Sequence, residues 1–293
     1  MPDRWTETFE THRDRLFNLA YRMLSQVQAA EDAVQDAYLR WRSVDPAAVD
    51  DPGAYLTTIL TRLCLDELSS ARAERETYTG PWLPEPVVEP MDRPDRATEQ
   101  SDAVSLALLV VLETLPPRQR AVYVLREAFD LPYAKIAEIV DEREAYCRKL
   151  AQRAREKIDE QDVETDARPE EQAQLIDTLI SAVEDGDAET VAQTLAEDAV
   201  VTSDGGGKVT AARRPVEGRD HITRFMLGIA EQAPDDLAVE YILVNGRPGL
   251  LATVDGEPQS VWFFHVRDGQ IQSAYAVLNP DKLRHIHPSR EDG

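Results

Sequence analysis

The stretch LPYAKIAEIVDEREAYCRKLAQRAREKI, residues Leu131–Ile158, decides how the rest of the chain is understood. Apolar residues at helical spacing, including Ile136 and Val140, predict a first short helix, and Leu150 and Ala154 predict a second that packs back on it. The second helix is basic although the protein as a whole is acidic. Its cations are Arg148, Lys149, Arg153, Arg155 and Lys157.

Two interpretations of this helix pair remain open when it is taken alone. The pair is either a helix-turn-helix whose second helix approaches DNA, or an ordinary amphipathic hairpin with a solvated charged face. Two details count against DNA binding: Asp141 stands where a glycine would relax the turn, and Arg143 stands where a capping residue is preferred. The rest of the chain has to decide between them.

Length and composition indicate a soluble protein of two or three domains, since the chain has 293 residues and 42% hydrophobic residues. No apolar run approaches membrane-spanning length and the N-terminus is too polar for a secretory signal, so we expect a cytoplasmic location with no membrane partner. Cys64 and Cys147 are far apart inside helical patterns, which predicts buried free thiols and no metal site. We expect no cofactor.

The net charge of -23 is unusual for a DNA-binding candidate, whose field normally attracts phosphate. Both halves of the chain are acidic, so no acidic tail explains the bias. The acidity and the scarcity of lysine beside arginine suggest a cytoplasm rich in salt. At molar ionic strength the Debye length is about 3 Å, so the overall charge would repel DNA only weakly.

The first 76 residues predict a helical bundle. Apolar residues recur at helical spacing within Trp5–Leu24, within AAEDAVQDAYLRWRSV and within PGAYLTTILTRLCLDELSSARAERE, the segment that Asp51 and Pro52 open. The nearly wholly apolar VSLALLVVLETL, Val104–Leu115, and the following PPRQRAVYVLREAFDLPY predict a second small core over the helix-turn-helix.

In this order, AYRML, AEDAVQDAYLRW, AYLTTILTRLCLDEL and the helix-turn-helix resemble the two DNA-binding domains of an extracytoplasmic-function (ECF) sigma factor of the sigma-70 family. The resemblance implies region 2 in residues 1–76 and region 4 in residues 103–160, with core RNA polymerase and promoter DNA as partners. In that family the second helix docks on the clamp helices of the polymerase β′ subunit. The residues implied here are Asp32, Gln35, Asp36 and Trp41.

The same resemblance implies two DNA contacts. Region 2 meets the melted -10 element, read as extruded and stacked bases, while region 4 meets the -35 element in the major groove. This chain departs from the family at Glu67, Ser69 and Glu74, where arginines are expected. The implied contact residues are Arg62, Arg72 and Arg75 in region 2, and Arg143, Arg148, Lys149 and Arg153 in region 4.

Residues 77–102 are rich in proline and acid and predict a linker, although they contain Tyr78, Trp82 and Leu83. Trp82 either plugs the edge of the first domain or docks on another domain. Residues 161–170 predict a second, acidic linker. Beyond it, helices near 175–183, 191–195 and 221–229 precede strand-like runs AVVTS, KVTAARRPV, LAVEYILVN, GLLATVD, SVWFFHVRDG and IQSAYAVLN. Helices followed by a meander of strands predict an α+β cone of the SnoaL type in residues 171–284, with a tail at 285–293.

WLPEP in the first linker, DGGGK and NPDKL resemble the signature stretches of ECF sigma factors with a fused SnoaL-like extension. That resemblance implies regulation in cis, in which the extension contacts the sigma domains and the linker and no separate anti-sigma factor is required. We therefore expect the three stretches to meet. Their residues are Trp82, Leu83 and Pro84; Asp204, Gly205, Gly206, Gly207 and Lys208; and Asn279, Pro280, Asp281, Lys282 and Leu283.

The fold class expected is thus multidomain, with two all-α sigma domains followed by an α+β SnoaL-like cone. The alternative is a SnoaL-type small-molecule sensor or enzyme with a degraded DNA-binding module. Cones of this type enclose an apolar pocket that could bind an unknown small ligand. Asp204, Asp220, His221, Tyr241 and His265 could serve catalysis there, but they form no recognisable catalytic signature, so we expect no enzyme.

Overall fold

The computed structural model describes residues 4–45, 48–91, 104–161, 165 and 167–286, without the side chains of residues 71–76. The chain divides into two compact units. One combines Met1–Glu76 with Leu108–Asp162, and the other combines Thr77–Ala107 with Val163–Gly293. The predicted interdomain linker therefore belongs structurally to the C-terminal unit.

The N-terminal half of the first unit is built from α1 (Arg4–Glu10), α2 (Arg13–Leu24), α3 (Val27–Arg42) and α4 (Pro52–Glu76). Helix α2 ends where Ser25 takes a left-handed conformation, with φ of 56°, and its N–H donates to the Tyr21 carbonyl. The apolar faces of the helices meet in one core. Fully buried members include Leu19, Met23, Trp41, Leu56 and Leu60.

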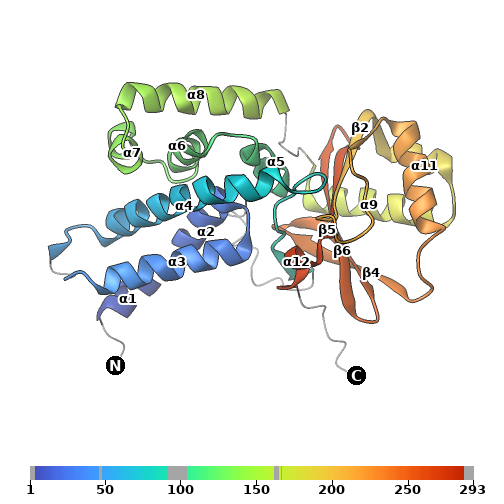
Figure 1. Cartoon of the computed structure of the whole chain (residues 1–293). Coiled ribbons are helices and arrows are strands. Elements are labelled where there is room, and N and C mark those ends of the chain that lie inside the picture. The colour runs from blue at the N-terminus through green and yellow to red at the C-terminus, as the bar shows by residue number, and fades with distance from the viewer. Residues whose placement is uncertain (1–3, 46–47, 92–103, 162–164, 166, 287–293) are drawn as a thin grey trace. The chain divides into compact units, whose positions relative to one another are not determined.

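The remaining helices of this unit are α5 (Leu106–Glu113), α6 (Pro117–Glu127), α7 (Tyr133–Val140) and α8 (Glu144–Gln161). Helix α5 begins at the boundary between the two units. Figure 1 shows α8 alongside α6 and α7, with α4 running between these helices and α2. Ile136 of α7 and Cys147 and Ala151 of α8 have no exposed surface, so the helix pair packs as the apolar spacing predicts.

The second unit contains a seven-stranded sheet in the order β1-β4-β5-β6-β7-β2-β3. Its strands are β1 (Val88–Pro90), β2 (Leu195–Asp204), β3 (Val216–Glu217), β4 (Leu237–Val244), β5 (Arg247–Val254), β6 (Glu257–Arg267) and β7 (Gln270–Val277). Strands β2 and β7 are parallel, whereas the other neighbouring strands are antiparallel.

Two-residue turns join β4 to β5, β5 to β6 and β6 to β7. They are Asn245-Gly246, Asp255-Gly256 and Asp268-Gly269, and all six residues have positive φ. This backbone matches the twist of the flanking strands, which explains why Asn-Gly and Asp-Gly pairs recur at these corners.

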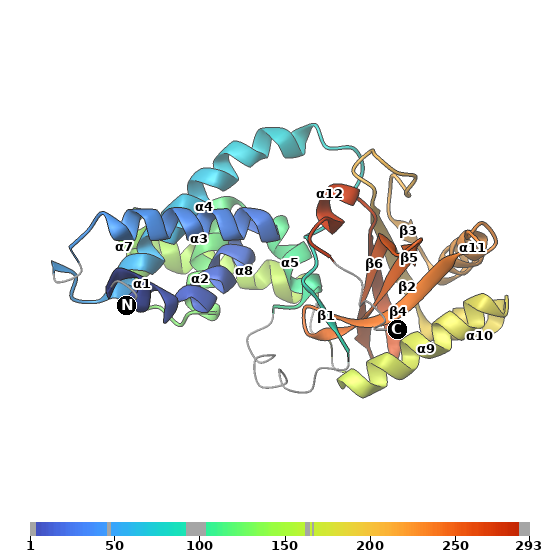
Figure 2. The same ribbon diagram turned by 90° about the horizontal axis from the view of Figure 1, so that it is seen from below.

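Helices cover both sides of this sheet. Helices α9 (Pro169–Glu184) and α11 (Arg219–Ala230) lie on one side, next to α10 (Ala188–Thr194), while α12 (Pro280–Leu283) lies on the other (Figure 2). The larger core lies under α9 to α11 and includes Ile176, Leu179, Ile222, Phe264 and Ile271. This arrangement is the α+β SnoaL-like fold expected from the order of helices and strands.

Several boundaries differ from the expectation. In KVTAARRPV only Val216 enters a strand, and β1 forms inside the predicted linker. Helix α9 begins at Pro169, inside the predicted acidic linker. The predicted tail starts too early, because Ile286 is 5% exposed and the His285 ring contacts the Pro86 carbonyl at 2.8 Å. Among the described helices, none combines the length and the hydropathy needed to cross a bilayer.

Candidate functional site

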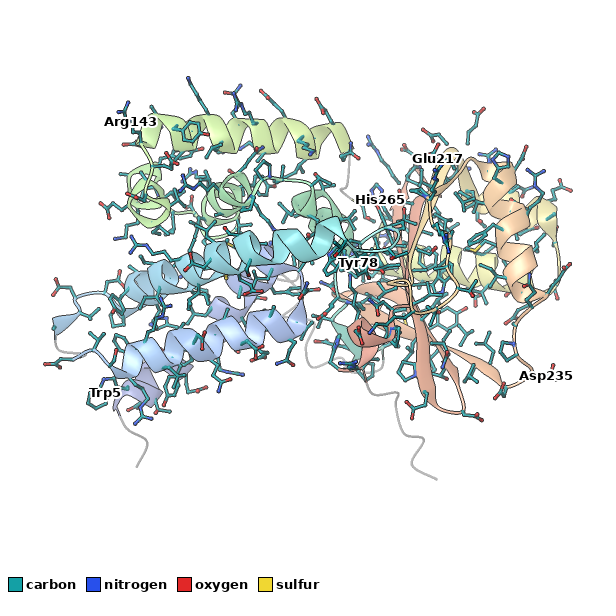
Figure 3. The ribbon with its side chains drawn as sticks, in the orientation of Figure 1. Trp5, Tyr78, Arg143, Glu217, Asp235 and His265 are labelled. Atoms are coloured by element: carbon teal, nitrogen blue, oxygen red, sulfur yellow. The ribbon has the colours of Figure 1, made fainter. Side chains whose placement is uncertain are left out.

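The outward face of α8 and the residue just before it carry cations that have no side-chain partner among the described residues. Cys147, Leu150 and Ala154 turn inward, whereas Arg143, Lys149 and Arg153 are exposed and make no side-chain hydrogen bond or ion pair with the described residues. Figure 3 labels Arg143 at the start of α8, on the outer side of the helix pair. Three of the four predicted -35 contact residues therefore present unpaired guanidinium or ammonium groups.

The other cations of α8 hold the helix to its scaffold. Arg148 pairs with Glu144, and its guanidinium lies 4.9 Å from the centre of the Tyr133 ring. Arg155 donates to Glu127 of α6 at 2.5 Å, and Lys157 donates to the Thr114 carbonyl at 3.0 Å. Arg148 lies on the Tyr133 ring of α7, but its side chain is still 59% exposed, so its DNA contact stays a prediction.

The turn between α7 and α8 accommodates both Asp141 and Arg143, the two residues that counted against a helix-turn-helix in the sequence. Asp141 takes the left-handed conformation, with φ of 55° and ψ of 55°, and its N–H donates to the Ala137 carbonyl. Aspartate tolerates this region better than most residues. The Arg143 carbonyl accepts from the Tyr146 and Cys147 amides, which begins the hydrogen bonding of α8 although Arg143 offers no side-chain cap. The turn is therefore well formed without glycine or a polar cap.

The predicted polymerase-docking surface lies on α3, where Asp32, Gln35 and Asp36 are exposed. Trp41 was predicted wrongly as a member of this surface. It has no exposed area, and its Nε1 donates to the Trp5 carbonyl at 3.0 Å, which ties α3 to α1 (Figure 3 labels Trp5). Burying the large apolar area of a tryptophan stabilises the fold, so Trp41 packs into the helical core instead of facing solvent.

Leu39 is the apolar residue that the sequence reasoning missed on this surface. It is 57% exposed and lies three and four residues after Asp36 and Gln35, so it shares their face of α3. The signal was present in the sequence, because helical spacing separates Leu39 from the buried positions Ala37 and Trp41.

A groove of about 430 Å³ runs between α3 and α4 next to this surface. Its apolar floor is formed by Ala29, Ala33 and Leu63. Its rim is mostly acidic and comprises Asp32, Asp36, Arg40, Asp66, Glu67 and Ser70.

Arg62, predicted to contact the -10 element, is engaged within the first unit. Its Nε donates to the Ile139 carbonyl at 3.2 Å and its Nη2 donates to the Glu138 carbonyl at 3.1 Å. These carbonyls end α7, where the helix dipole favours a cation. Arg72 and Arg75 lie outside the described side chains, so their predicted contacts remain predictions.

Arg120 of α6 makes a second connection between the two halves of the first unit. It is 1% exposed and pairs with Glu113 at 2.7 Å. It also donates to the Arg22 carbonyl at 3.0 Å and to the Ser25 hydroxyl at 2.5 Å, both at the end of α2. Sequence reasoning did not single it out, because a buried arginine cannot be told from an exposed one by its type.

In the second unit the three signature stretches meet at Asp204, which has no exposed surface. Its carboxylate accepts from the Tyr78 hydroxyl at 2.5 Å and from the Leu83 N–H at 2.8 Å. It also accepts from the Gly206 N–H at 3.0 Å and from Lys282 Nζ at 2.7 Å. Four donors from three segments thus converge on one carboxylate at the end of β2.

Lys282 completes this cluster from the other side. Its side chain is 3% exposed and its Nζ also donates to the Leu83 carbonyl. The Nζ lies 3.3 Å from the centre of the Trp82 ring and 5.3 Å from that of Tyr78. A desolvated ammonium over two aromatic faces gains cation–π attraction in addition to its ion pair. We call Tyr78, Trp82, Leu83, Asp204 and Lys282 the linker clasp.

Burial is the main reason why the pKa of the Tyr78 hydroxyl lies above its usual range, and its hydrogen bond to the Asp204 carboxylate raises that pKa further. Tyr78 therefore stays protonated and keeps donating to Asp204. Asn279 Nδ2 supports this geometry by donating to the Tyr78 oxygen at 2.8 Å.

The remaining residues of the signature stretches shape the clasp. A Cβ on Gly206 would lie 2.3 Å from Asn279 Nδ2, and one on Gly205 would lie 2.8 Å from the Val209 carbonyl, so the loop has no room for side chains there. Gly207, with φ of 70°, packs on Thr79 of the linker. The other members have simpler positions: Pro84 and Leu283 are buried, Pro280 is exposed, and Lys208 pairs with Asp281 at the surface.

A second hold on the linker was not predicted. Strand β1 pairs with β4 from Val88 opposite Val244 to Pro90 opposite Ile242. Asn245 donates its N–H to the Val87 carbonyl at 2.8 Å and accepts from the Val87 N–H at 3.0 Å through Oδ1. Its Nδ2 donates to the Val104 carbonyl at 2.9 Å. One side chain thus binds the linker at Val87 and the chain just beyond the predicted linker at Val104. A three-residue strand is too short to be recognised from periodicity.

The residues considered for catalysis do not form one site. Asp204 is occupied by the clasp, while Asp220 and His221 are exposed on α11. Tyr241 is 37% exposed and donates to Asp177 at 3.0 Å, and burial raises the pKa of its hydroxyl to about 12. His265 follows the core residue Phe264 along β6 and so faces the opposite side of the sheet.

Comparisons with known proteins agree with this organisation. The family Sigma-70 region 2 matches residues 8–74, and the family Sigma-70, region 4 matches residues 105–158. The ECF RNA polymerase sigma factor SigJ of Mycobacterium tuberculosis is 40% identical over 287 residues, covering 94% of this chain and 92% of that protein. A probable ECF RNA polymerase sigma factor SigI of the same species is 32% identical, covering 96% of this chain and 95% of that protein.

Among solved structures, the crystal structure of M. tuberculosis extracytoplasmic function sigma factor SigJ covers 95% of this chain and 98% of its own. The two have 37% sequence identity and a TM-score of 0.78. The likeness therefore extends over both units.

Proposed function

The chain belongs to the ECF RNA polymerase sigma factors, and we propose that its SnoaL-like C-terminal unit regulates it in cis by holding the linker between its two sigma regions. As a sigma factor it binds core RNA polymerase and directs transcription initiation from specific promoters. The regulatory part of the proposal starts from the position of the linker, which runs from the end of region 2 to the start of region 4.

The observation that carries the proposal is the linker clasp. Leu83 is 1% exposed, its N–H donates to Asp204 and its carbonyl accepts from Lys282, so both polar groups of one linker residue are bound by the C-terminal unit. A buried ion pair whose members are also hydrogen-bonded is strongly destabilised when one partner is lost. The clasp is thus a strong and specific hold on a segment that would otherwise be a free spacer.

The second hold strengthens this interpretation. Because Asn245 binds Val87 and Val104, it fixes both sides of the linker stretch 88–103 to the same corner of the sheet. A linker fixed at the clasp and at Asn245 cannot change the spacing of regions 2 and 4 without breaking these contacts. We infer that the clasped form restrains polymerase binding and that release of the linker relieves the restraint.

The first unit supports a restrained form independently. Arg62 is bound to the last carbonyls of α7, and Arg120 joins α6 to the end of α2. For Arg62 to reach the melted -10 strand, α7 has to leave it. Because restraint comes from the same chain, the proposed regulation requires no separate anti-sigma factor.

The proposed promoter and polymerase contacts follow from exposure. Arg143 just before α8 and Lys149 and Arg153 on it have cationic groups that are unpaired within the described part of the chain, and they would contact the -35 element. On α3 the exposed residues Asp32, Gln35 and Asp36 would dock on the β′ clamp helices, with Leu39 as the apolar centre of that contact.

The experiment that tests regulation in cis compares Trp82→Ala with Trp82→Phe in the full-length protein. The alanine removes the ring on which Lys282 lies, whereas phenylalanine keeps an aromatic face. If only a fraction of the molecules is released, apparent affinity for polymerase scales with that fraction. Titration of core RNA polymerase should therefore show tighter binding by Trp82→Ala and wild-type binding by Trp82→Phe. Equal affinities for all three proteins would refute the proposed restraint.

A further inference from the structure

The recognition helix α8 carries a large, partly exposed aromatic ring in its first turn. Tyr146 is 42% exposed, and its phenol makes no hydrogen bond to the part of the chain that the structure describes. The neighbouring positions Cys147 and Leu150 supply the packing of this part of α8, with 0% and 6% exposure. Tyr146 therefore contributes little to the fold.

Tyr146 occupies the first turn of α8, which begins at Glu144. At 100° per residue it shares a stripe with Lys149 and Arg153, at the border of the buried side of the helix. These two cations are exposed and unpaired among the described residues, as is Arg143 just before the helix. A ring thus lies in the middle of the surface assigned to the -35 element. In a helix-turn-helix the first residues of the recognition helix are those that reach base edges.

We propose that Tyr146 is a specificity-determining residue of the promoter contact, and that its ring packs on the 5-methyl group of a thymine in the major groove of the -35 element. The inference rests on the sigma-factor function. All base edges in the major groove present hydrogen-bonding groups, and thymine alone adds an apolar feature, its 5-methyl group. An exposed ring on the reading face complements that methyl group, while the flanking cations complement phosphates and guanine acceptors.

The test removes the methyl group without changing any hydrogen bond. Full-length protein with core polymerase is first used to select a promoter from a library, and each thymine of its -35 element is then replaced by deoxyuridine. One buried methyl group contributes about fourfold in affinity. We expect the wild-type protein to bind the deoxyuridine promoter about fourfold more weakly at one position, measured by promoter titration.

Two variants complete the test. Tyr146→Ala should bind the thymine promoter more weakly and be indifferent to deoxyuridine, whereas Tyr146→Phe should behave as the wild type. Unchanged melting temperatures in both variants would show that the fold is intact, as the exposure of Tyr146 predicts.

Three outcomes would overturn the inference. If Tyr146→Phe is as weak as Tyr146→Ala and deoxyuridine has no effect, the phenol binds a phosphate instead. Wild-type binding by Tyr146→Ala would mean that the ring makes no contact. Deoxyuridine sensitivity that persists in Tyr146→Ala would assign the methyl contact to another residue. Each differs from failure of the sigma function itself, in which no promoter would be selected at all.

Discussion

Replacing Asp204 with asparagine tests the linker clasp most sharply, because the substitution keeps the size of the side chain and removes its charge. Asp204 has no exposed surface and accepts from Tyr78, Leu83, Gly206 and Lys282. An asparagine offers one acceptor oxygen and one donor nitrogen, so at least one donor faces an N–H group. Lys282, 3% exposed, is left with a buried charge that no carboxylate balances.

Breaking a buried ion pair by removing one partner is worth about 3–5 kcal/mol. For a unit of this size, about 1 kcal/mol lowers the melting temperature by about 2–4 °C, so the transition of the second unit should fall by at least about 6 °C. If this loss of free energy affects only the release of the linker, the population of molecules with a released linker should rise at least about a hundredfold, since about 1.4 kcal/mol is a factor of ten.

Hydrogen exchange distinguishes these two effects. The Leu83 amide donates to Asp204, whereas the Val87 amide donates to Asn245. In Asp204→Asn the Leu83 amide should lose protection by about a hundredfold or more, and the Val87 amide should lose less because its own hold is intact. Adding Lys282→Met removes the unbalanced charge and should restore part of the melting temperature.

Lys208→Ala is the matched control. It breaks the ion pair between Lys208 and Asp281, which joins the DGGGK and NPDKL stretches as the clasp does, but both side chains are substantially exposed, at 51% and 37%. An exposed pair is worth at most about 1 kcal/mol. If Asp204→Asn changes stability and Leu83 exchange no more than Lys208→Ala does, the clasp is not the hold that its geometry indicates.

Four further predictions concern the first unit. Leu39→Asp should weaken binding to core polymerase at least about tenfold without lowering the melting temperature, because hot-spot residues contribute about 2 kcal/mol or more. Trp41→Ala should lower the free energy of unfolding in urea by about 3–5 kcal/mol, and a binding defect without destabilisation would return Trp41 to the docking surface. Arg120→Met leaves Glu113 without its buried partner and should lower the same free energy by about 3–5 kcal/mol; an unchanged urea midpoint would contradict the proposed role of Arg120 in joining the two halves of the unit. Burial raises the pKa of the Cys64 thiol to about 12, so the thiolate fraction at pH 8 is about one in ten thousand, and a thiol reagent should modify Cys64 only after unfolding; rapid native modification would contradict its burial.

The fold was predictable where local chemistry decides it. Apolar spacing located α7 and α8, and the strand-like runs located β4 to β7. Both cysteines are buried free thiols, as their helical surroundings predict. These features depend on neighbours close in sequence, which a reader of the sequence can see.

The functional surfaces were predictable only in part, because residue type does not reveal which partner a side chain chooses. Arg148 and Arg153 look equivalent in the sequence and both are exposed, yet only Arg148 of the two lies on an aromatic ring of the described residues, that of Tyr133. Arg62 lies 76 residues before Glu138, whose carbonyl it binds, and periodicity carries no information over that distance. The three signature stretches could be recognised because each has a distinctive sequence. Asn245 could not, because nothing in the sequence distinguishes it from any other asparagine in a turn.

Regulation in cis of promoter-specific initiation is the central claim, and it is tested most directly by transcription in vitro. Core RNA polymerase is mixed with a promoter library and with a limiting concentration of one of three proteins, the wild type, Asp204→Asn or Lys208→Ala. Each mixture is assayed at low and at high potassium salt. We predict promoter-specific transcripts with all three proteins, and a higher initiation rate with Asp204→Asn alone. Equal rates with Asp204→Asn and Lys208→Ala would contradict regulation through the clasp, and the absence of initiation at every salt concentration would contradict the account as a whole.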